Sequence, residues 1–183
     1  MIKPGTVVAG PHTRIEFEQT SAQTDGKLLR FEETFQVGME RPPMHIHATQ
    51  SEAFTVLRGK LAVRVGAETR ILGPGESIVA QPGTAHTLWN AGDEVCVHTV
   101  EMVPALAMED YFYEIVTLEA EGGIPHKSLA QAGRIATLFL RHHNQLAGLP
   151  WSVQRVAFRL LVVLARWFTP SPAAPLASSQ SKV

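Results

Sequence analysis

The sequence has a single cysteine, Cys96, among its 183 residues. One thiol cannot form an intrachain disulfide, so the framework of a small disulfide-rich secreted domain is excluded and a reducing compartment is expected. Charged residues make up 18% of the chain and hydrophobic residues 45%. This composition is too apolar for disorder along the whole chain, and the length fits about one folded domain with an appendage.

Long uncharged apolar runs are also missing. No such run reaches the roughly 18 to 20 residues of a membrane-spanning helix. The first ten residues, MIKPGTVVAG, lack the apolar core that a signal peptide needs. We therefore expect a cytoplasmic protein without a transmembrane helix.

Acidic residues are absent from the last third of the chain. Residues 1–121 hold all 17 acids with 9 of the 16 basic residues, a formal charge of −8, whereas residues 122–183 hold 7 basic residues and no acid. A contrast of this size predicts that the second part meets an anionic surface, either elsewhere on this protein or on a partner.

Short β-branched and aromatic runs fill residues 6–103, and turns containing Gly or Pro separate them. This pattern is typical of an all-β sandwich or barrel. The expected strands are Arg14–Glu18, Lys27–Val37, Ala53–Leu57, Leu61–Val65, Thr69–Leu72, Ser77–Ala80, His86–Trp89 and Glu94–Val103.

Apolar residues take helical spacing after Pro104. Three helices are expected, over Ala105–Ala120, from Ser128 to about His143 with Ser128 as its N-cap, and over Trp151–Phe168. We therefore divide the chain into a β-barrel (1–104), a helical extension packed on the barrel or at an interface (105–168), and a disordered tail rich in Pro, Ser and Ala (169–183).

Four side chains of metal-ligand type fall in two short stretches. The first carries His45, His47 and Glu52, and the second carries His86. His45 and His47 are two residues apart, so on a strand both imidazoles project from one face. Three imidazoles and one carboxylate leave open positions on a divalent transition metal ion such as Fe, Mn, Ni, Cu, Co or Zn. A closed structural zinc site is disfavoured because the one cysteine lies outside both stretches.

The two stretches resemble the paired signature motifs of the cupin superfamily. The first reads Gly, His-x-His, Glu, Gly, and the second reads Gly, Pro-x-Gly, two residues, His, three residues, Asn. The resemblance implies metal ligands at His45, His47, Glu52 and His86, and turns at the motif glycines, which are Gly38, Gly59, Gly75 and Gly83, with Asn90 closing the second motif.

The sequence departs from these motifs at two places, both in turns. Six residues rather than five separate Gly38 from His45, and Gln81 occupies the usual proline position, with Pro82 one residue later. The resemblance covers roughly residues 30–103. It implies a mainly β fold, a cupin jelly-roll β-barrel, followed by the C-terminal α-helical extension.

Apolar residues are expected around the ion. Strand parity places Phe54 and Val56 on the same side as Glu52, which suits a small aromatic or enolic ligand. Glu52 has two candidate roles, as a metal ligand or as the catalytic general base that deprotonates a bound hydroxyl. The other histidines singled out, which are His12, His98 and His126, are expected to be hydrogen-bonded structural residues or surface residues.

Similarity to the small single-domain cupins implies a metal-dependent dioxygenase of the quercetinase type, an oxidoreductase. Two alternatives stay open, a non-catalytic small-molecule-binding cupin and a metal-dependent isomerase or lyase that polarises a carbonyl. No nucleic-acid partner is expected, because no helix-turn-helix precedes the barrel and the first part of the chain is acidic.

The resemblance also implies a homodimer.

The segment 151–168 carries a stripe of Arg155, Arg159 and Arg166 on an otherwise apolar helix. One hypothesis packs this helix on the barrel, on the preceding helix or across a dimer interface. The other lays it in the plane of a membrane surface, as peripheral membrane contact, because it is too short to span a bilayer.

Overall fold

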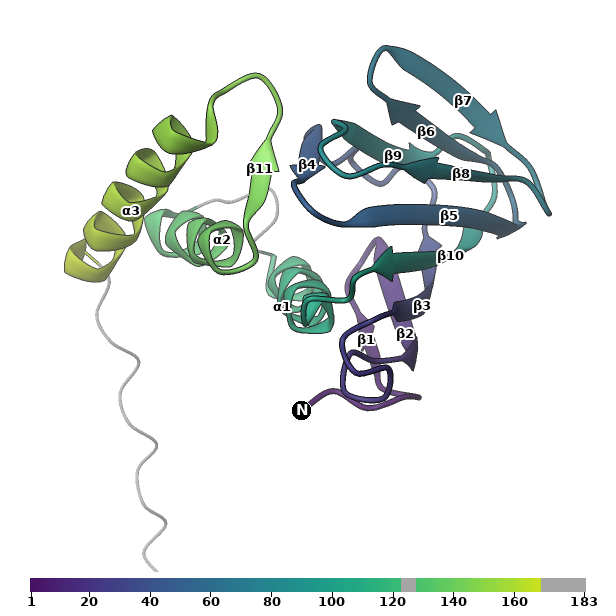
Figure 1. Cartoon of the computed structure of the whole chain (residues 1–183), viewed down its shortest axis with the longest axis horizontal. Helices are drawn as coiled ribbons and strands as arrows, with labels where there is room; N and C mark the ends of the chain where they lie inside the picture. Colours follow the sequence, from purple (N-terminus) through teal and green to yellow (C-terminus); the bar gives the residue numbers. More distant parts are fainter. Residues whose placement is uncertain (123–127, 169–183) are drawn as a thin grey trace, which may run out of the picture.

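The computed structural model describes residues 1–122 and 128–168. Two antiparallel sheets form a mainly β body, and helices of the C-terminal part lie to one side of it (Figure 1). His126 and the predicted tail at 169–183 lie outside the described residues. Among the described residues, no helix combines the length and hydropathy needed to cross a bilayer.

The two sheets have the topology expected of a jelly-roll barrel. The first has the order β1-β2-β3-β10-β5-β8, with β1 (Val7–Ala9), β2 (Thr13–Gln19), β3 (Leu29–Phe35), β10 (Cys96–Val103), β5 (Ser51–Arg58) and β8 (Ser77–Ala80). The second has the order β11-β4-β9-β6-β7, with β11 (Asn144–Leu146), β4 (His45–His47), β9 (His86–Asn90), β6 (Leu61–Val65) and β7 (Glu68–Leu72). The predicted strands are confirmed, with ends that shift by a few residues, whereas β1, β4 and β11 were not among them.

The barrel core follows from alternation along the strands. In β5, Glu52, Phe54 and Val56 are buried and the residues between them are partly exposed, as the strand parity predicts. Phe17 of β2 and Phe31 of β3 belong to the same sheet and the same core cluster as Phe54, and all three side chains are fully buried. Burial of these side chains, at about 25 cal/mol per Å² of apolar surface, is the main term that holds the sheets together.

Two motif glycines have structural reasons that other residues could not meet. Gly59 has φ +80°, and a Cβ there would lie 2.7 Å from the carbonyl oxygen of Val95. Gly83 has φ +78°, and its N–H donates to the carbonyl oxygen of His47 at 2.8 Å. This hydrogen bond fixes the turn before β9 against β4, so the two motifs are held together by backbone contacts.

The extension contains α1 (Met108–Ala120), α2 (Leu129–Arg141) and α3 (Trp151–Phe168). The first helix begins three residues later than predicted, because Leu106 and Ala107 have positive φ angles of 46° and 55°. The Ser128 cap is confirmed, since its hydroxyl oxygen accepts a hydrogen bond from the N–H of Gln131 at 3.2 Å.

The extension is joined to the barrel by a strand. In β11, Asn144 pairs with His47 and Leu146 pairs with His45, so β11 adds an edge to the strand that carries both histidines. The side chain of Gln154 in α3 hydrogen-bonds the N–H and the carbonyl oxygen of Leu146 at 2.8 Å each. One strand of the extension thus belongs to a barrel sheet. The division of the chain at residue 104 stays a prediction.

Candidate metal centre

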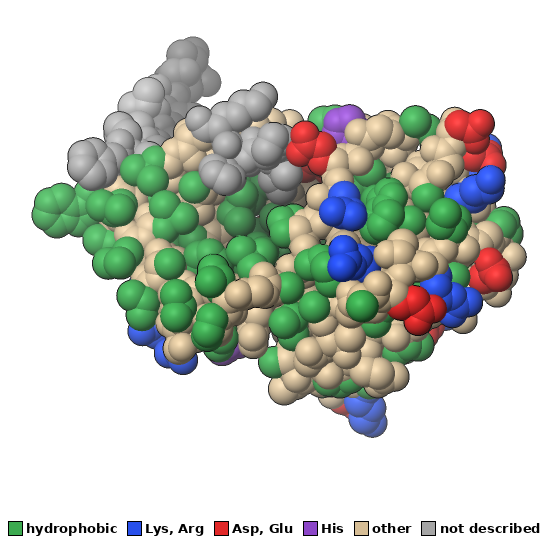
Figure 2. Space-filling view, turned by 90° about the horizontal axis from the view of Figure 1, so that it is seen from above, with side chains coloured by type: hydrophobic (Ala, Val, Ile, Leu, Met, Phe, Trp, Pro, Cys, Tyr) green, Lys and Arg blue, Asp and Glu red, His purple; other side chains and the backbone are tan. Residues whose placement is uncertain are grey.

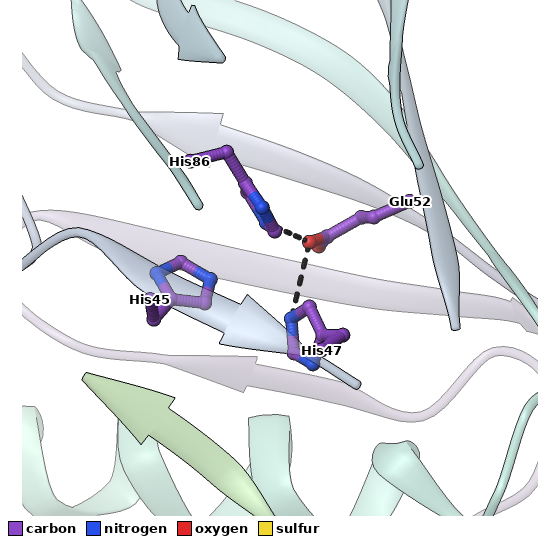
Figure 3. A group of neighbouring side chains, drawn as sticks. All are labelled: His45, His47, Glu52 and His86. Carbon is purple, nitrogen blue, oxygen red and sulfur yellow. Dashed lines mark hydrogen bonds and ion pairs between the residues drawn. The ribbon is translucent and has the colours of Figure 1, made fainter. Parts of the chain in front are cut away.

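The structure brings together the four side chains of the predicted centre. One potential ligand atom from each of His45, His47, Glu52 and His86 lies within 4.8 Å of all the others (Figure 3). β4 and β9 are neighbours, with His45 opposite His86, and β5 of the other sheet supplies Glu52. The cluster thus lies between the two sheets, where His47, Glu52 and His86 are buried and His45 is half-buried.

Backbone carbonyl groups orient two of the imidazoles. Nδ1 of His45 lies 3.1 Å from the carbonyl oxygen of Pro43, and Nδ1 of His86 lies 3.0 Å from that of Thr84. A carbonyl oxygen only accepts, so each Nδ1 carries the proton and donates it. Each Nε2 is then the atom left for the cluster, which is the arrangement used by metal-bound histidines.

Glu52 is held as a carboxylate. Its Oε2 lies 2.8 Å from Nε2 of His86 and 3.3 Å from Nε2 of His47. Burial by itself raises the pKa of Glu52, but the polar contacts and charges of the two histidines outweigh it and hold the pKa below its ordinary range.

The histidines differ in charge. Burial, together with the nearby His86 and His47, lowers the pKa of His45 to about 4, so His45 is neutral at pH 7. Burial also acts to lower the pKa of His86, but the hydrogen bond and charge of Glu52 raise it above its usual value of 6.5. Both nitrogens of His86 face acceptors, so this ring is an imidazolium that neutralises Glu52.

His47 provides the test of whether a cation fits. Both of its ring nitrogens are buried, and neither has a partner in hydrogen-bond geometry within residues 1–122 and 128–168. An unsatisfied buried polar group costs about 1 to 3 kcal/mol. A cation bound by the cluster would satisfy Nε2, and three neutral imidazoles with one carboxylate suit a divalent transition metal ion. The residues present therefore fit such an ion.

Apolar residues line the inner side of the cluster. The ring centroid of Phe54 lies 6.2 Å from that of His86 and 6.4 Å from that of His98, so the Phe54 ring neighbours both imidazoles. His98 is fully buried, and its Nε2 lies 3.1 Å from the carboxylate of Glu33. Of the two roles expected for these histidines, His98 has that of a hydrogen-bonded structural residue, and His12 is exposed at the surface.

Sequence reasoning missed two polar residues that approach the cluster from the extension. Asn144 of β11 is 1% exposed and lies opposite His47, and Tyr111 of α1 lies beside the Asn144 side chain. Burial, together with the negative charge of Glu52, raises the pKa of Tyr111 to about 12, so the hydroxyl keeps its proton. No motif spacing marks either residue, because one lies in a helix and the other follows one.

The comparison with family models gives a match for residues 31–101, to the family described as the Cupin domain. Residues 31–101 of this chain are a domain of the cupin superfamily. The matched range agrees with residues 30–103, over which the sequence resembles that superfamily, and it contains His45, His47, Glu52 and His86. Tyr111 and Asn144 lie outside it, so this cupin receives polar groups from a part of the chain beyond the family pattern.

Several solved structures resemble this chain, whereas a search of curated proteins found no match. KdgF from Halomonas sp. is 20% identical, with 51% of this chain and 80% of that chain covered and a TM-score of 0.45. An RmlC-like cupin from Shewanella frigidimarina is 18% identical, with 58% of this chain and 88% of that chain covered and a TM-score of 0.49. A predicted oxalate decarboxylase from Thermotoga maritima is 12% identical, with 57% of this chain and 99% of that chain covered and a TM-score of 0.49.

Proposed function

We propose that this cupin is a metal-dependent dioxygenase that acts on a small aromatic or enolic molecule. The observation that carries the proposal is the gathering of three imidazoles and one carboxylate within 4.8 Å inside an apolar barrel. Such a donor set binds a divalent transition metal ion and leaves room for further ligands. Phe54, whose ring neighbours that of His86, and Val56, buried on the same side of β5, suit the flat apolar body of such a substrate.

The residues that would hold the ion are His45, His47 and His86 through Nε2, and Glu52 through its carboxylate. A bound ion would supply an exchangeable coordination position for an enolic oxygen or for dioxygen. The half-buried His45 lies on the more accessible side of the cluster, while the other three residues are almost fully enclosed. Substrate would therefore approach past His45.

Glu52 is the proposed general base. It is ionised and already accepts a hydrogen bond from Nε2 of His86 at 2.8 Å. A substrate hydroxyl in this position would transfer its proton to Glu52, which turns an enol into the more electron-rich enolate. The neighbouring Tyr111 hydroxyl and Asn144 amide offer hydrogen bonds that position a second polar group of the substrate.

Oxygen consumption tests the proposal. The protein is reconstituted separately with Fe, Mn, Ni, Cu, Co and Zn, and oxygen uptake is recorded with flavonols and other enolic compounds. We expect uptake with at least one metal, and its loss in His86→Ala. Tyr111→Phe and Asn144→Ala should keep the metal and raise KM or lower kcat by about tenfold or more, as the loss of supporting groups around metal ligands does.

The other outcomes identify the two alternative functions. Binding of these compounds without conversion, measured by calorimetry, would replace the dioxygenase with a non-catalytic small-molecule-binding cupin. Conversion that proceeds equally without oxygen would indicate an isomerase or lyase that polarises a carbonyl. Either result would leave the metal centre in place and remove the oxidative reaction.

A further inference from the structure

α3 presents an apolar face that is exposed in the described part of the chain. Its exposed apolar side chains are between 49% and 83% exposed and comprise Val153, Val156, Leu160, Val163, Leu164 and Trp167. At 3.6 residues per turn they fall within an arc of about 100°. Hydrophobic side chains accordingly gather on the helical end of the molecule, at the left of Figure 2. A shallow apolar hollow lies on this face between Val153 and Leu160.

The opposite face of α3 packs on the rest of the described chain. Gln154 and Ala165 are buried, and the ring centroid of Phe158 lies 5.6 Å from that of Phe139 in α2. A Cβ on Gly133 of α2 would lie 2.4 Å from Cβ of Ala165, so the two helices are in close contact. α3 is therefore anchored on the molecule, and its outer apolar face is not needed for that contact.

The basic charge of the extension divides into two groups. Arg134 and Arg141 of α2 pair with Glu121 and with Glu114, the second at 2.9 Å. Arg155, Arg159 and Arg166 form no ion pair with any described residue, and they lie along one flank of the apolar face. The charge contrast predicts that the extension meets an anionic surface. For Arg134 and Arg141, acids in α1 and at its C-terminal end supply the negative charge. For the other three arginines, no described part of the chain supplies it.

We propose that the outer face of α3 binds in the plane of an anionic phospholipid surface. The apolar side chains enter the boundary between headgroups and acyl chains, and the three arginines contact lipid phosphates. Trp167, which is 83% exposed, suits the interface because its ring is both apolar and polar. The helix lies at the end of the molecule away from the acidic barrel (Figure 1), so the barrel need not approach the negative surface.

Charge favours lipid over a second copy of the chain. Two α3 helices that pair antiparallel about a two-fold axis place both arginine flanks on the same side of the contact. In a parallel pair, the two arginine flanks lie on opposite sides of the contact, each beside the other copy of α3, and residues 151–168 contain no acid. Both arrangements leave the arginines facing uncharged or basic groups, whereas an anionic bilayer supplies the missing negative charge.

Vesicle flotation with the full chain tests this proposal. We expect retention on vesicles of phosphatidylcholine with phosphatidylglycerol, at least tenfold weaker binding to phosphatidylcholine alone, and weakening as salt rises. Leu160→Glu should lower retention more than tenfold. Ile71→Glu is the matched control, since Ile71 in β7 is as exposed as Leu160 and the substitution adds the same charge. Replacing Arg155, Arg159 and Arg166 together with Gln should lower retention by at least tenfold.

Further readouts separate binding from misfolding and from self-association. Circular dichroism and thermal unfolding should be unchanged in Leu160→Glu, because Leu160 is exposed. Anionic vesicles should shift the tryptophan emission to shorter wavelength in the wild type and not in Trp167→Phe. No retention on anionic vesicles, or equal retention on neutral ones, would overturn the proposal. So would a dimer, measured by light scattering, that Leu160→Glu dissociates, because a second copy would then cover this face.

Discussion

The barrel and the extension use apolar residues in opposite ways. In the barrel, Phe54 and Val56 are buried on the same side of β5 as Glu52, and more exposed residues alternate with them along the strand. In α3, one apolar face packs on α2 while another points away from the molecule. Similar side chains thus form a closed core in one region and an open surface in the other. The proposed chemistry therefore belongs to the first region, and the proposed lipid contact belongs to the second.

Truncating a side chain in each region should show this difference most strongly. Phe54→Ala removes a fully buried ring and should lower the free energy of unfolding by about 3 to 5 kcal/mol. Leu160→Ala, on the exposed face of α3, should change it by less than about 0.5 kcal/mol. Urea denaturation measures both values. A large loss in Leu160→Ala would show that the outer face of α3 is already buried in the isolated protein.

The contact between α2 and α3 can be broken without touching the barrel. Gly133→Val places side-chain atoms where Ala165 lies and should lower stability by about 1 to 3 kcal/mol. Ala157→Val, on the exposed side of α3, is the control and should have little effect. Metal content should be the same in both variants. A fall in metal content of Gly133→Val would show that the helices support β4 through β11.

The charge of the metal centre predicts a pH dependence that the extension does not share. His86 holds a proton because Glu52 raises its pKa, so metal binding must release that proton. Apparent metal affinity should rise by about tenfold per pH unit (about 1.4 kcal/mol) until the pH passes the raised pKa of His86, and then level off. Calorimetry in buffers of different ionisation enthalpy measures the proton released. His98→Gln, outside the cluster, should behave like the wild type, and absence of proton release at pH 7 would contradict the assignment.

Surface charge should contribute least to holding the extension in place. Arg141→Gln removes the exposed ion pair with Glu114, and we expect a loss below about 1 kcal/mol because water and salt screen such pairs. Thermal unfolding at low and high salt measures the effect. A larger loss would mean that α2 is held to α1 by charge rather than by apolar packing.

The sequence predicted the barrel and its cluster better than the extension. Period-two alternation located β5 and β6, and the spacing of two short motifs identified four side chains that the fold brings together. These signals are strong because a motif glycine such as Gly59 is required by a contact that no other residue tolerates. Local sequence and tertiary packing therefore agree in this region.

Other features could not be predicted, because they depend on packing between distant segments. Residues 144–146 read Asn-Gln-Leu, which has no strand pattern, and they form β11 only because β4 offers an open edge. Tyr111 is one of several aromatic residues in a helix, and only the fold places it near Glu52. The homodimer implied by resemblance stays a prediction.

The central claim is that four side chains hold one metal ion inside the barrel. Elemental analysis of the full chain purified without added metal, beside His47→Ala and the control His12→Ala, tests it most directly. We expect one transition metal ion per chain in the wild type and in His12→Ala, and none in His47→Ala. Equal metal content in all three proteins, or no metal after addition of any of the six candidate ions, would contradict the account.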